Sequence, residues 1–119
     1  MSALRGKRVL LVEDEAVIAF AVEDILLDLG CQVVGPAFSL EEAIAMASAE
    51  PIDAAILDVN LNDQRSYAVA DELQRRGIPF LFATGYAEGG VGWDRSEVAV
   101  LPKPYRSEQI AAALGRLLN

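Results

Sequence analysis

Five short runs of apolar residues recur along the chain, and segments with helical spacing separate most of them. The runs, rich in Val, Ile, Leu or Phe, are Arg8–Val12, Gln32–Gly35, Ala54–Leu57, Phe80–Ala83 and Val98–Leu101. Apolar residues follow one another in these runs without polar alternation, which is typical of strands covered on both faces. The pattern therefore predicts five strands of a buried sheet.

Four other segments carry apolar residues at helical spacing and have recognisable ends. The helices that we expect are Glu15–Leu29, Ser39–Glu50, Ser66–Arg76 and Ser107–Leu118. In the second of these, Ser39 with Glu42 three residues later forms a capping-box pattern. By contrast, the segment Gly85–Glu97 holds four glycines and has a poor helical signal. A helix in that segment, the fourth in chain order, is expected to be short or irregular.

The alternation of strands and helices with short connections predicts right-handed crossovers and a parallel sheet. Five such strands in 119 residues fit an α/β fold with a doubly wound, flavodoxin-like sheet of strand order 2-1-3-4-5. A chain of this length makes one ordinary domain and buries about two-thirds of the surface that its unfolded chain exposes. We therefore expect residues 1–119 to form a single domain.

Composition narrows the classes of function. Hydrophobic residues make up 53% and charged residues 24% of the chain, which excludes a disordered chain. The net charge of −8 argues against unaided binding to nucleic acid or to an anionic membrane. The sequence has no histidine, which excludes histidine-dependent catalysis, and its single cysteine, Cys31, fits a reducing compartment. Because no signal peptide or transmembrane pattern is present, we expect a cytoplasmic protein.

Polar side chains stand where four of the apolar runs end. Glu13 and Asp14 follow the first run, Asp58 follows the third, Thr84 follows the fourth, and Lys103 comes shortly after the fifth. The carboxyl ends of parallel strands meet at one edge of the sheet. We therefore expect these residues near the switch point between the first and third strands.

The three carboxylates indicate a metal-dependent phosphoryl transfer. Close carboxylates repel one another unless a cation lies among them, and oxygen ligands of this kind suit magnesium best. With magnesium neutralising phosphate oxygens, an aspartate can act as the nucleophile and form an aspartyl-phosphate. Lys103 can pair with the remaining phosphoryl oxygens, and the Thr84 hydroxyl can donate to another.

Each residue alone also has a plainer interpretation. Asp14 can be a helix N-cap, and Asp58 can cap a turn, although a carboxylate at the end of an apolar strand is costly to bury unpaired. Thr84 alone is an ordinary strand residue, and Lys103 alone is an ordinary surface lysine. Prolines on both sides of Lys103 pin its backbone and weaken that interpretation. Taken together, in this order on the strand ends, the residues favour a joint site.

Four stretches of the chain, VLLVEDE, AAILDVNL, FLFATGY and LPKPY, carry a family resemblance. With them, the chain resembles a response-regulator receiver domain of two-component signalling over essentially its whole length. The FATGY stretch is similar to a branch of receivers that are named for this motif and often occur as stand-alone proteins.

The resemblance implies a role for each acidic residue of the site. Asp58 accepts a phosphoryl group from a phospho-histidine on a sensor histidine kinase or a histidine phosphotransfer protein. Asp14 and Asp58 bind magnesium directly, Glu13 acts through water, and the backbone carbonyl of Asn60 adds a ligand.

The resemblance also implies roles beyond the metal. Thr84 and Lys103 contact the phosphoryl oxygens, and Tyr86 lies where the family tunes loss of the phosphoryl group. One position departs from the family pattern, because Val100 stands where a switch aromatic is usual. Because of this departure and of the glycine-rich segment after Gly85, we expect that ordering of this segment, instead of the usual threonine–aromatic coupling, is the conformational switch that responds to phosphorylation.

The function expected from these observations is that of a stand-alone phosphoacceptor that signals by phosphorylation-dependent protein contact. Its output surface would be the face of the fourth strand, the fifth strand and the last helix. The domain would catalyse at most its own slow phosphotransfer and dephosphorylation and is not expected to be an enzyme. Two alternatives stay open. One is a receiver-like scaffold that is never phosphorylated, and the other is an aspartyl-phosphate phosphatase, which the lack of a second aspartate at Asn60 disfavours.

Overall fold

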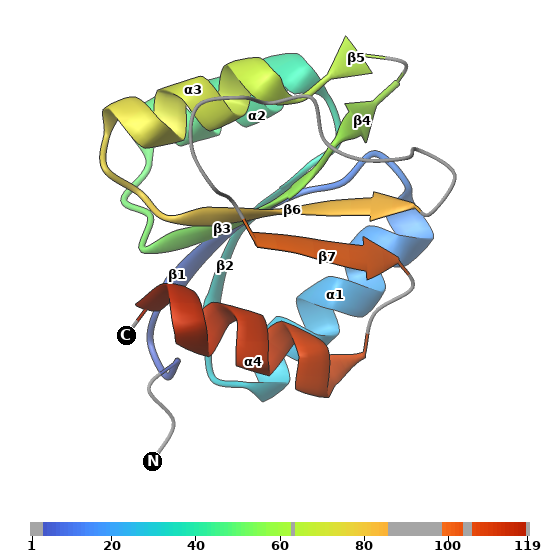
Figure 1. Cartoon of the computed structure of the whole chain (residues 1–119), viewed down its shortest axis with the longest axis vertical. Coiled ribbons are helices and arrows are strands. Elements are labelled where there is room, and N and C mark those ends of the chain that lie inside the picture. Colours follow the sequence, from blue (N-terminus) through green and yellow to red (C-terminus); the bar gives the residue numbers. More distant parts are fainter. Residues whose placement is uncertain (1–3, 63, 86–98, 104–105, 119) are drawn as a thin grey trace.

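A parallel sheet of five strands crosses the middle of the molecule, with two of the described helices on each face (Figure 1). A computed structural model describes residues 4–62, 64–85, 99–103 and 106–118, and of residues 84, 85 and 99–103 it describes the backbone alone. The strand pairs of this sheet are parallel. The arrangement is the doubly wound α/β fold that the sequence predicts.

The order of the strands confirms the predicted topology. The strands of the sheet are β1 (Arg8–Val12), β2 (Gln32–Ala37), β3 (Ala54–Asp58), β6 (Phe80–Gly85) and β7 (Ala99–Lys103), in the spatial order β2-β1-β3-β6-β7. Counted along the chain among themselves, these five strands have the order 2-1-3-4-5. A short antiparallel hairpin, β4 (Asn60–Leu61) with β5 (Gln64–Arg65), follows β3 outside the main sheet.

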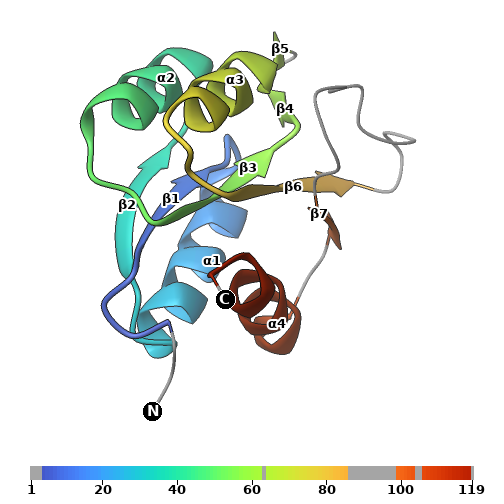
Figure 2. The same ribbon diagram turned by 60° about the vertical axis from the view of Figure 1, so that its left-hand side comes forward.

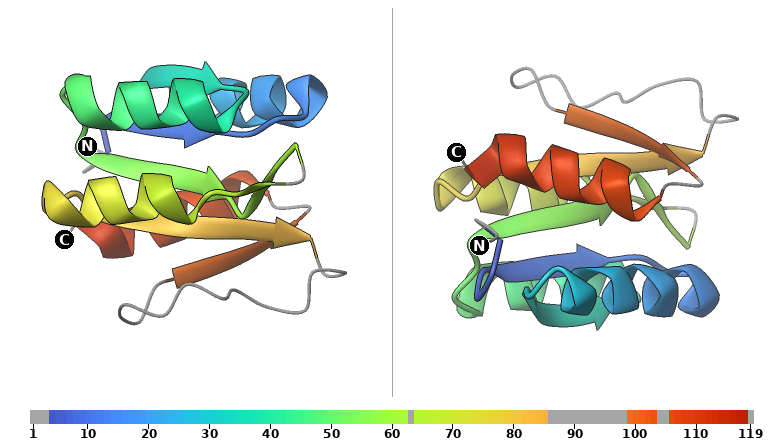
Figure 3. Two further views of the ribbon diagram at one scale, coloured as in Figure 1. Left: turned by 90° about the horizontal axis from the view of Figure 1, so that it is seen from above. Right: turned by 90° about the horizontal axis from the view of Figure 1, so that it is seen from below.

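The helices form the two outer layers. They are α1 (Ala16–Asp28), α2 (Leu40–Ala49), α3 (Tyr67–Arg75) and α4 (Ser107–Leu118). Helices α2 and α3 cover one face of the sheet, and α1 and α4 cover the other (Figures 2 and 3). Among the described residues, none of the helices has both the length and the apolar character needed to cross a membrane.

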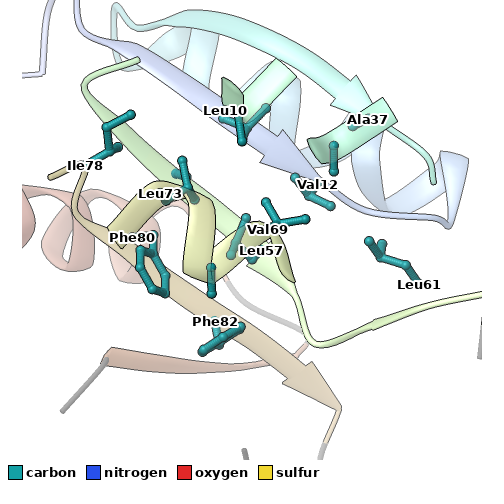
Figure 4. Close-up of a cluster of buried hydrophobic side chains, with 14 of the residues drawn as sticks. Leu10, Val12, Ala37, Leu57, Leu61, Val69, Leu73, Ile78, Phe80 and Phe82 are labelled. Atoms are coloured by element: carbon teal, nitrogen blue, oxygen red, sulfur yellow. The ribbon is translucent and has the colours of Figure 1, made fainter. Parts of the chain in front are cut away.

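Helices cover both faces of the sheet, and successive residues of a strand point to opposite faces. Each strand therefore contributes to two buried clusters. In β1, Leu10 packs in the cluster beneath α2 and α3, whereas Leu11 packs in the cluster against α1 and α4. The same alternation places Leu57 of β3 and Phe82 of β6 in the cluster beneath α2 and α3 (Figure 4). Burial on both sides explains why the strands are continuous apolar runs in the sequence.

The strands extend beyond the predicted apolar runs. β3 includes Asp58, β6 reaches Gly85 and β7 reaches Lys103, because ladder pairing continues past the last apolar residue of each run. β2 continues through Pro36 to Ala37. A proline is tolerated there because β2 lies at the edge of the sheet and needs ladder partners on one side alone.

The ends of the helices lie close to the predicted ones. At α2, the Ser39 hydroxyl accepts a hydrogen bond from the N–H of Glu42 at 3.1 Å, and the Glu42 carboxylate accepts one from the N–H of Phe38 at 3.1 Å. The predicted cap of this helix is therefore confirmed. At α1, the N-cap residue is Glu15 rather than Asp14, so Asp14 does not cap this helix.

The hairpin β4–β5 has no counterpart among the predicted elements. Each of its strands has two residues, and a period-two pattern is not recognisable over so short a stretch. Of the segment Gly85–Glu97, for which an irregular helix is predicted, Gly85 is the last residue of β6, and the rest lies outside the described residues.

Candidate functional site

Three carboxylates meet at the carboxyl ends of β1 and β3. Glu13 and Asp14 directly follow β1, and Asp58 is the last residue of β3. The two strands are neighbours, with Val12 paired to Leu57, so the next residue of each strand lies at the same level of the sheet. One carboxylate oxygen from each of the three residues lies within 4.8 Å of the others. The fold therefore brings together the acidic residues that the sequence places at the switch point.

This acidic cluster is largely shielded from water. Glu13 is 1% exposed and Asp58 is 4% exposed, while Asp14 is partly buried. Like charges that are close and buried repel one another, and a cation bound among them would relieve this repulsion. Three carboxylate oxygens are the donor set of a hard divalent cation, and magnesium, which keeps part of its water shell, fits them.

The connections that follow β1 and β3 lead from the acidic cluster to opposite faces of the sheet. After β1 the chain enters α1 on one face of the sheet, and after β3 it continues through the hairpin to α3 on the other face (Figure 1). Connections that diverge in this way mark the topological switch point, where open α/β sheets bind their ligands. The cluster therefore lies at the position that the fold favours for a site.

Backbone hydrogen bonds hold the acidic residues in place. The N–H of Glu13 donates to the carbonyl oxygen of Ala37 in β2 at 3.0 Å. The N–H of Glu15 donates to Oε2 of Glu13 at 3.2 Å, and the N–H of Asn62 donates to Oδ2 of Asp14 at 2.9 Å. Because a backbone amide holds one oxygen of each of these two carboxylates, their rotation is restricted.

The backbone register brings Thr84 and Lys103 to the same edge of the sheet. Asp58 of β3 pairs with Ala83 of β6, the residue before Thr84, and β6 pairs with β7 as far as Lys103. The side chains of Thr84 and Lys103 lie outside the described residues, and so does the whole of Tyr86. The roles that the sequence assigns to these three residues stay predictions.

Asn60 begins the hairpin two residues after Asp58. It pairs with Arg65 of β5, and its side-chain oxygen accepts a hydrogen bond from the guanidinium group of Arg65. Between the two site residues, Val59 is fully buried, and its N–H donates to the carbonyl oxygen of Ala83 at 3.1 Å. The hairpin is thus firmly attached to the sheet, while the role of the Asn60 carbonyl as a metal ligand stays a prediction.

Asn62 is a residue of this site to which none of the sequence motifs points. Its N–H is the donor to Asp14, and its backbone has a φ of +50° in the loop of the hairpin. An available signal was the dipeptide Asn62-Asp63, because Asn and Asp are frequent in tight turns and tolerate positive φ. The signal was weak because the flanking strands are so short.

Comparison with known proteins identifies the kind of domain to which this site belongs. The family model of the response regulator receiver domain matches residues 9–115. Over 122 residues, the chain is 33% identical to the phyllosphere-induced regulator PhyR of Methylorubrum extorquens, an alignment that covers 99% of this chain and 46% of PhyR. The chain spans about half the length of the curated relatives that it matches.

Solved structures resemble the chain over nearly its whole length. The solution structure of SdrG from Sphingomonas melonis Fr1 is 42% identical in sequence, with a TM-score of 0.84, and the match covers 100% of both chains. The crystal structure of the anti-anti-sigma factor PhyR from Bartonella quintana is 28% identical, with a TM-score of 0.82, over 95% of this chain and 47% of that one. The similarity therefore includes the strand ends that carry the acidic cluster.

Proposed function

The chain belongs to the response regulator receiver family, and on this premise we propose that it accepts a phosphoryl group on Asp58 with the help of magnesium. Members of this family are signalling modules rather than enzymes. The phosphoryl group on Asp58 then serves as a signal that changes contacts with another protein.

The observation that carries this proposal is the close approach of three carboxylates at the ends of β1 and β3, with Asp58 almost fully buried. Keeping like charges together inside a fold costs stability, and such a cost is usually found where function requires it. Asp58 is the member of the cluster that belongs to a strand of the sheet. A rigid strand end is a suitable support for a nucleophile.

Magnesium is the cofactor that this donor set fits. Asp14 and Asp58 would hold it directly, Glu13 would act through water, and the carbonyl of Asn60 would add a ligand. A magnesium ion held there would supply positive charge to balance that of the phosphoryl oxygens. The backbone amides that hold Glu13 and Asp14 keep both carboxylates oriented for this task.

Asp58 acts as the nucleophile in the transfer. One of its carboxylate oxygens attacks the phosphorus of a phospho-histidine, the new O–P bond forms as the N–P bond breaks, and the electron pair of that bond returns to the imidazole nitrogen. Thr84 and Lys103 contact the remaining phosphoryl oxygens, and Tyr86 shields the product from water. Hydrolysis of the O–P bond later restores the Asp58 carboxylate and releases phosphate.

The proposed phosphodonor is a sensor histidine kinase or a histidine phosphotransfer protein. The chain contains no histidine, so a phospho-histidine must be supplied by such a partner. The output surface is formed by β6, β7 and α4. A relative described as an anti-anti-sigma factor supports an output through protein contact.

The complete mutual coverage with SdrG supports the interpretation of residues 1–119 as one receiver domain. The single buried Cys31 is compatible with a place in the reducing cytoplasm.

Phosphotransfer from a labelled histidine kinase tests this proposal. The chain is incubated with the phosphorylated kinase and Mg²⁺, and the transferred label is tested for stability in acid and loss in base, as expected of an acyl phosphate. We expect label on the wild type and on the control variant Asp53→Asn, and none on Asp58→Asn. Asp53 is a suitable control because it precedes β3, where its carboxylate accepts a hydrogen bond from the N–H of Arg8 at 2.8 Å.

Two results would contradict the proposal. Label that persists on Asp58→Asn would place the phosphoacceptor elsewhere in the chain. A wild type that takes no label from kinases, phosphotransfer proteins or acetyl phosphate would indicate a receiver-like scaffold that acts without phosphorylation.

A further inference from the structure

Asn62 connects the acidic cluster to another part of the chain. Its N–H donates to Oδ2 of Asp14 at 2.9 Å, and its side-chain Nδ2 donates to the carbonyl oxygen of Phe38 at 3.3 Å. Asp14 lies between β1 and α1, and Phe38 lies between β2 and α2. A single residue of the hairpin loop is therefore bonded to two segments that border the site.

The geometry of the hairpin makes the N–H of Asn62 available. Leu61 pairs with Gln64, so Asn62 is the first residue of a two-residue loop. The N–H groups of such loop residues take no part in the strand ladder and need another acceptor. The φ of +50° at Asn62 is rare for residues other than glycine, although asparagine tolerates it better than most. This conformation is retained where hydrogen bonds on both sides hold it.

The residue to which the Asn62 side chain binds is itself well fixed. The N–H of Phe38 donates to Oε1 of Glu42 at 3.1 Å, within the cap of α2. The ring of Phe38 meets the ring of Phe20 in α1 edge to face, with the centroids 6.1 Å apart. Because Phe38 is attached to both α1 and α2, its carbonyl is a firm acceptor for Asn62.

We propose that Asn62 is a positioning residue for the metal, whose N–H holds one oxygen of Asp14 and keeps this carboxylate turned toward Glu13 and Asp58. The inference rests on the proposed function and adds to it a residue that contacts neither metal nor phosphoryl group. A hydrogen bond from an amide to a carboxylate is charge-assisted and directional. Loss of such an outer partner weakens metal binding by about 10- to 100-fold in known sites.

Two substitutions distinguish the effect of the Asn62 N–H from the effect of its side-chain hydrogen bond to Phe38. Asn62→Gly keeps the N–H and allows the same φ, so it removes only the hydrogen bond to Phe38. Asn62→Val also removes that bond, but its β-branched side chain disfavours positive φ and turns the N–H away from Asp14. The difference between the two variants therefore reports the effect of the N–H on the metal.

A titration of the whole chain with Mg²⁺ alone, followed in ¹H–¹⁵N correlation spectra, tests the inference. We expect Asn62→Val to raise the dissociation constant for Mg²⁺ about 10-fold, toward the lower end of the range for lost outer partners. Asn62→Gly should raise it clearly less. The amide proton of Asn62 gives a second readout, because Asp14→Asn should shift its resonance upfield, whereas Asp24→Asn in α1 should leave it unchanged.

The possible outcomes are distinct. An Asn62→Val variant with a lower melting temperature in Mg²⁺-free buffer but an unchanged dissociation constant would overturn the inference, since Asn62 would then be merely structural. Equal losses of affinity in the valine and glycine variants would also overturn it, because glycine retains the N–H. A wild type that does not respond to Mg²⁺ would overturn the proposed function and this inference together.

Discussion

Substitution of glycine by alanine should have opposite effects on stability at Gly35 and Gly115, because the surroundings of the two residues differ. At Gly35, in the edge strand β2, φ is +101°, and an added Cβ would lie 2.8 Å from the nitrogen of Ala37 and 3.0 Å from the carbonyl oxygen of Leu11. At Gly115, inside α4, an added Cβ would meet nothing within 4 Å. The first position needs glycine, and the second does not.

We expect Gly35→Ala to lower the free energy of unfolding by about 2 kcal/mol or more, because it adds a backbone clash to an unfavourable φ. The same change at Gly115 should raise the free energy of unfolding by about 0.5–1 kcal/mol, since alanine restricts the unfolded chain and suits a helix. Urea denaturation measures both values. A Gly35→Ala variant as stable as the wild type would contradict the backbone geometry of β2.

Cys31 is a single residue whose reactivity follows from its burial. It is 4% exposed, and burial raises the pKa of its thiol. Because the thiolate is the reactive form, we expect the native protein to react with a disulfide reagent at least about tenfold more slowly than the urea-unfolded chain at the same pH. Equal rates would show that the thiol is accessible in the native state.

At the scale of elements, an arginine joins α2 to α3. Nη1 of Arg76, the C-cap residue of α3, donates to the carbonyl oxygens of Ala47 at 2.6 Å and Glu50 at 2.9 Å. These carbonyls lie at the C-terminal end of α2, where the helix dipole also favours a positive charge. We expect Arg76→Met to lower the free energy of unfolding by about 1.5–3 kcal/mol, the range for hydrogen bonds to charged groups.

The neighbouring Arg75 provides the matched control. Both arginines are exposed, but Arg75 hydrogen-bonds to Glu72 in its own helix at 3.0 Å and does not join two elements, so Arg75→Met should change stability little. The hydrogen bond from Arg75 lowers the pKa of Glu72. This pair therefore stabilises the fold above the usual pKa of a glutamate, and that effect is lost as the pH falls through the lowered value. Equal losses of stability in the two methionine variants would contradict the role of Arg76.

The main elements could be predicted from the sequence because burial on two faces produces a strong apolar signal. β1 and α4 have the predicted bounds, since each presents a clear pattern along its whole length. The end of β2 was harder to predict, because Pro36 normally ends a strand and is tolerated only at a sheet edge. The hairpin β4–β5 depends on a turn and on local side-chain contacts, which leave no periodic pattern in the sequence.

At the scale of the whole molecule, negative charge is concentrated in one half of the chain. Twelve acidic residues and no basic one lie between residues 9 and 64, and the three carboxylates of the cluster are among them. Their meeting could be predicted, because strand order alone brings the ends of β1 and β3 together. The contact of Asn62 with Asp14 could not, because it depends on the backbone conformation of a two-residue loop.

We expect Mg²⁺ to stabilise the whole domain and Asp14→Asn to abolish this effect. A ligand at ten times its dissociation constant raises the free energy of unfolding by about 1.4 kcal/mol. In Mg²⁺-free buffer, Asp14→Asn should be more stable than the wild type, because it removes one of three like charges. Melting temperatures with Mg²⁺ and with EDTA, at constant ionic strength, measure both effects. A response to Mg²⁺ that is the same in Asp14→Asn as in the control Asp24→Asn would contradict the assigned site.

The most direct test of the account is chemical identification of the phosphorylated residue. The chain is treated with acetyl phosphate and Mg²⁺ and then with borohydride, which reduces an aspartyl-phosphate to homoserine, and the position of homoserine is read by peptide mass spectrometry. We predict homoserine at residue 58, and none when EDTA replaces Mg²⁺. Homoserine at another aspartate, or its formation at residue 58 without a divalent cation, would contradict the central claim.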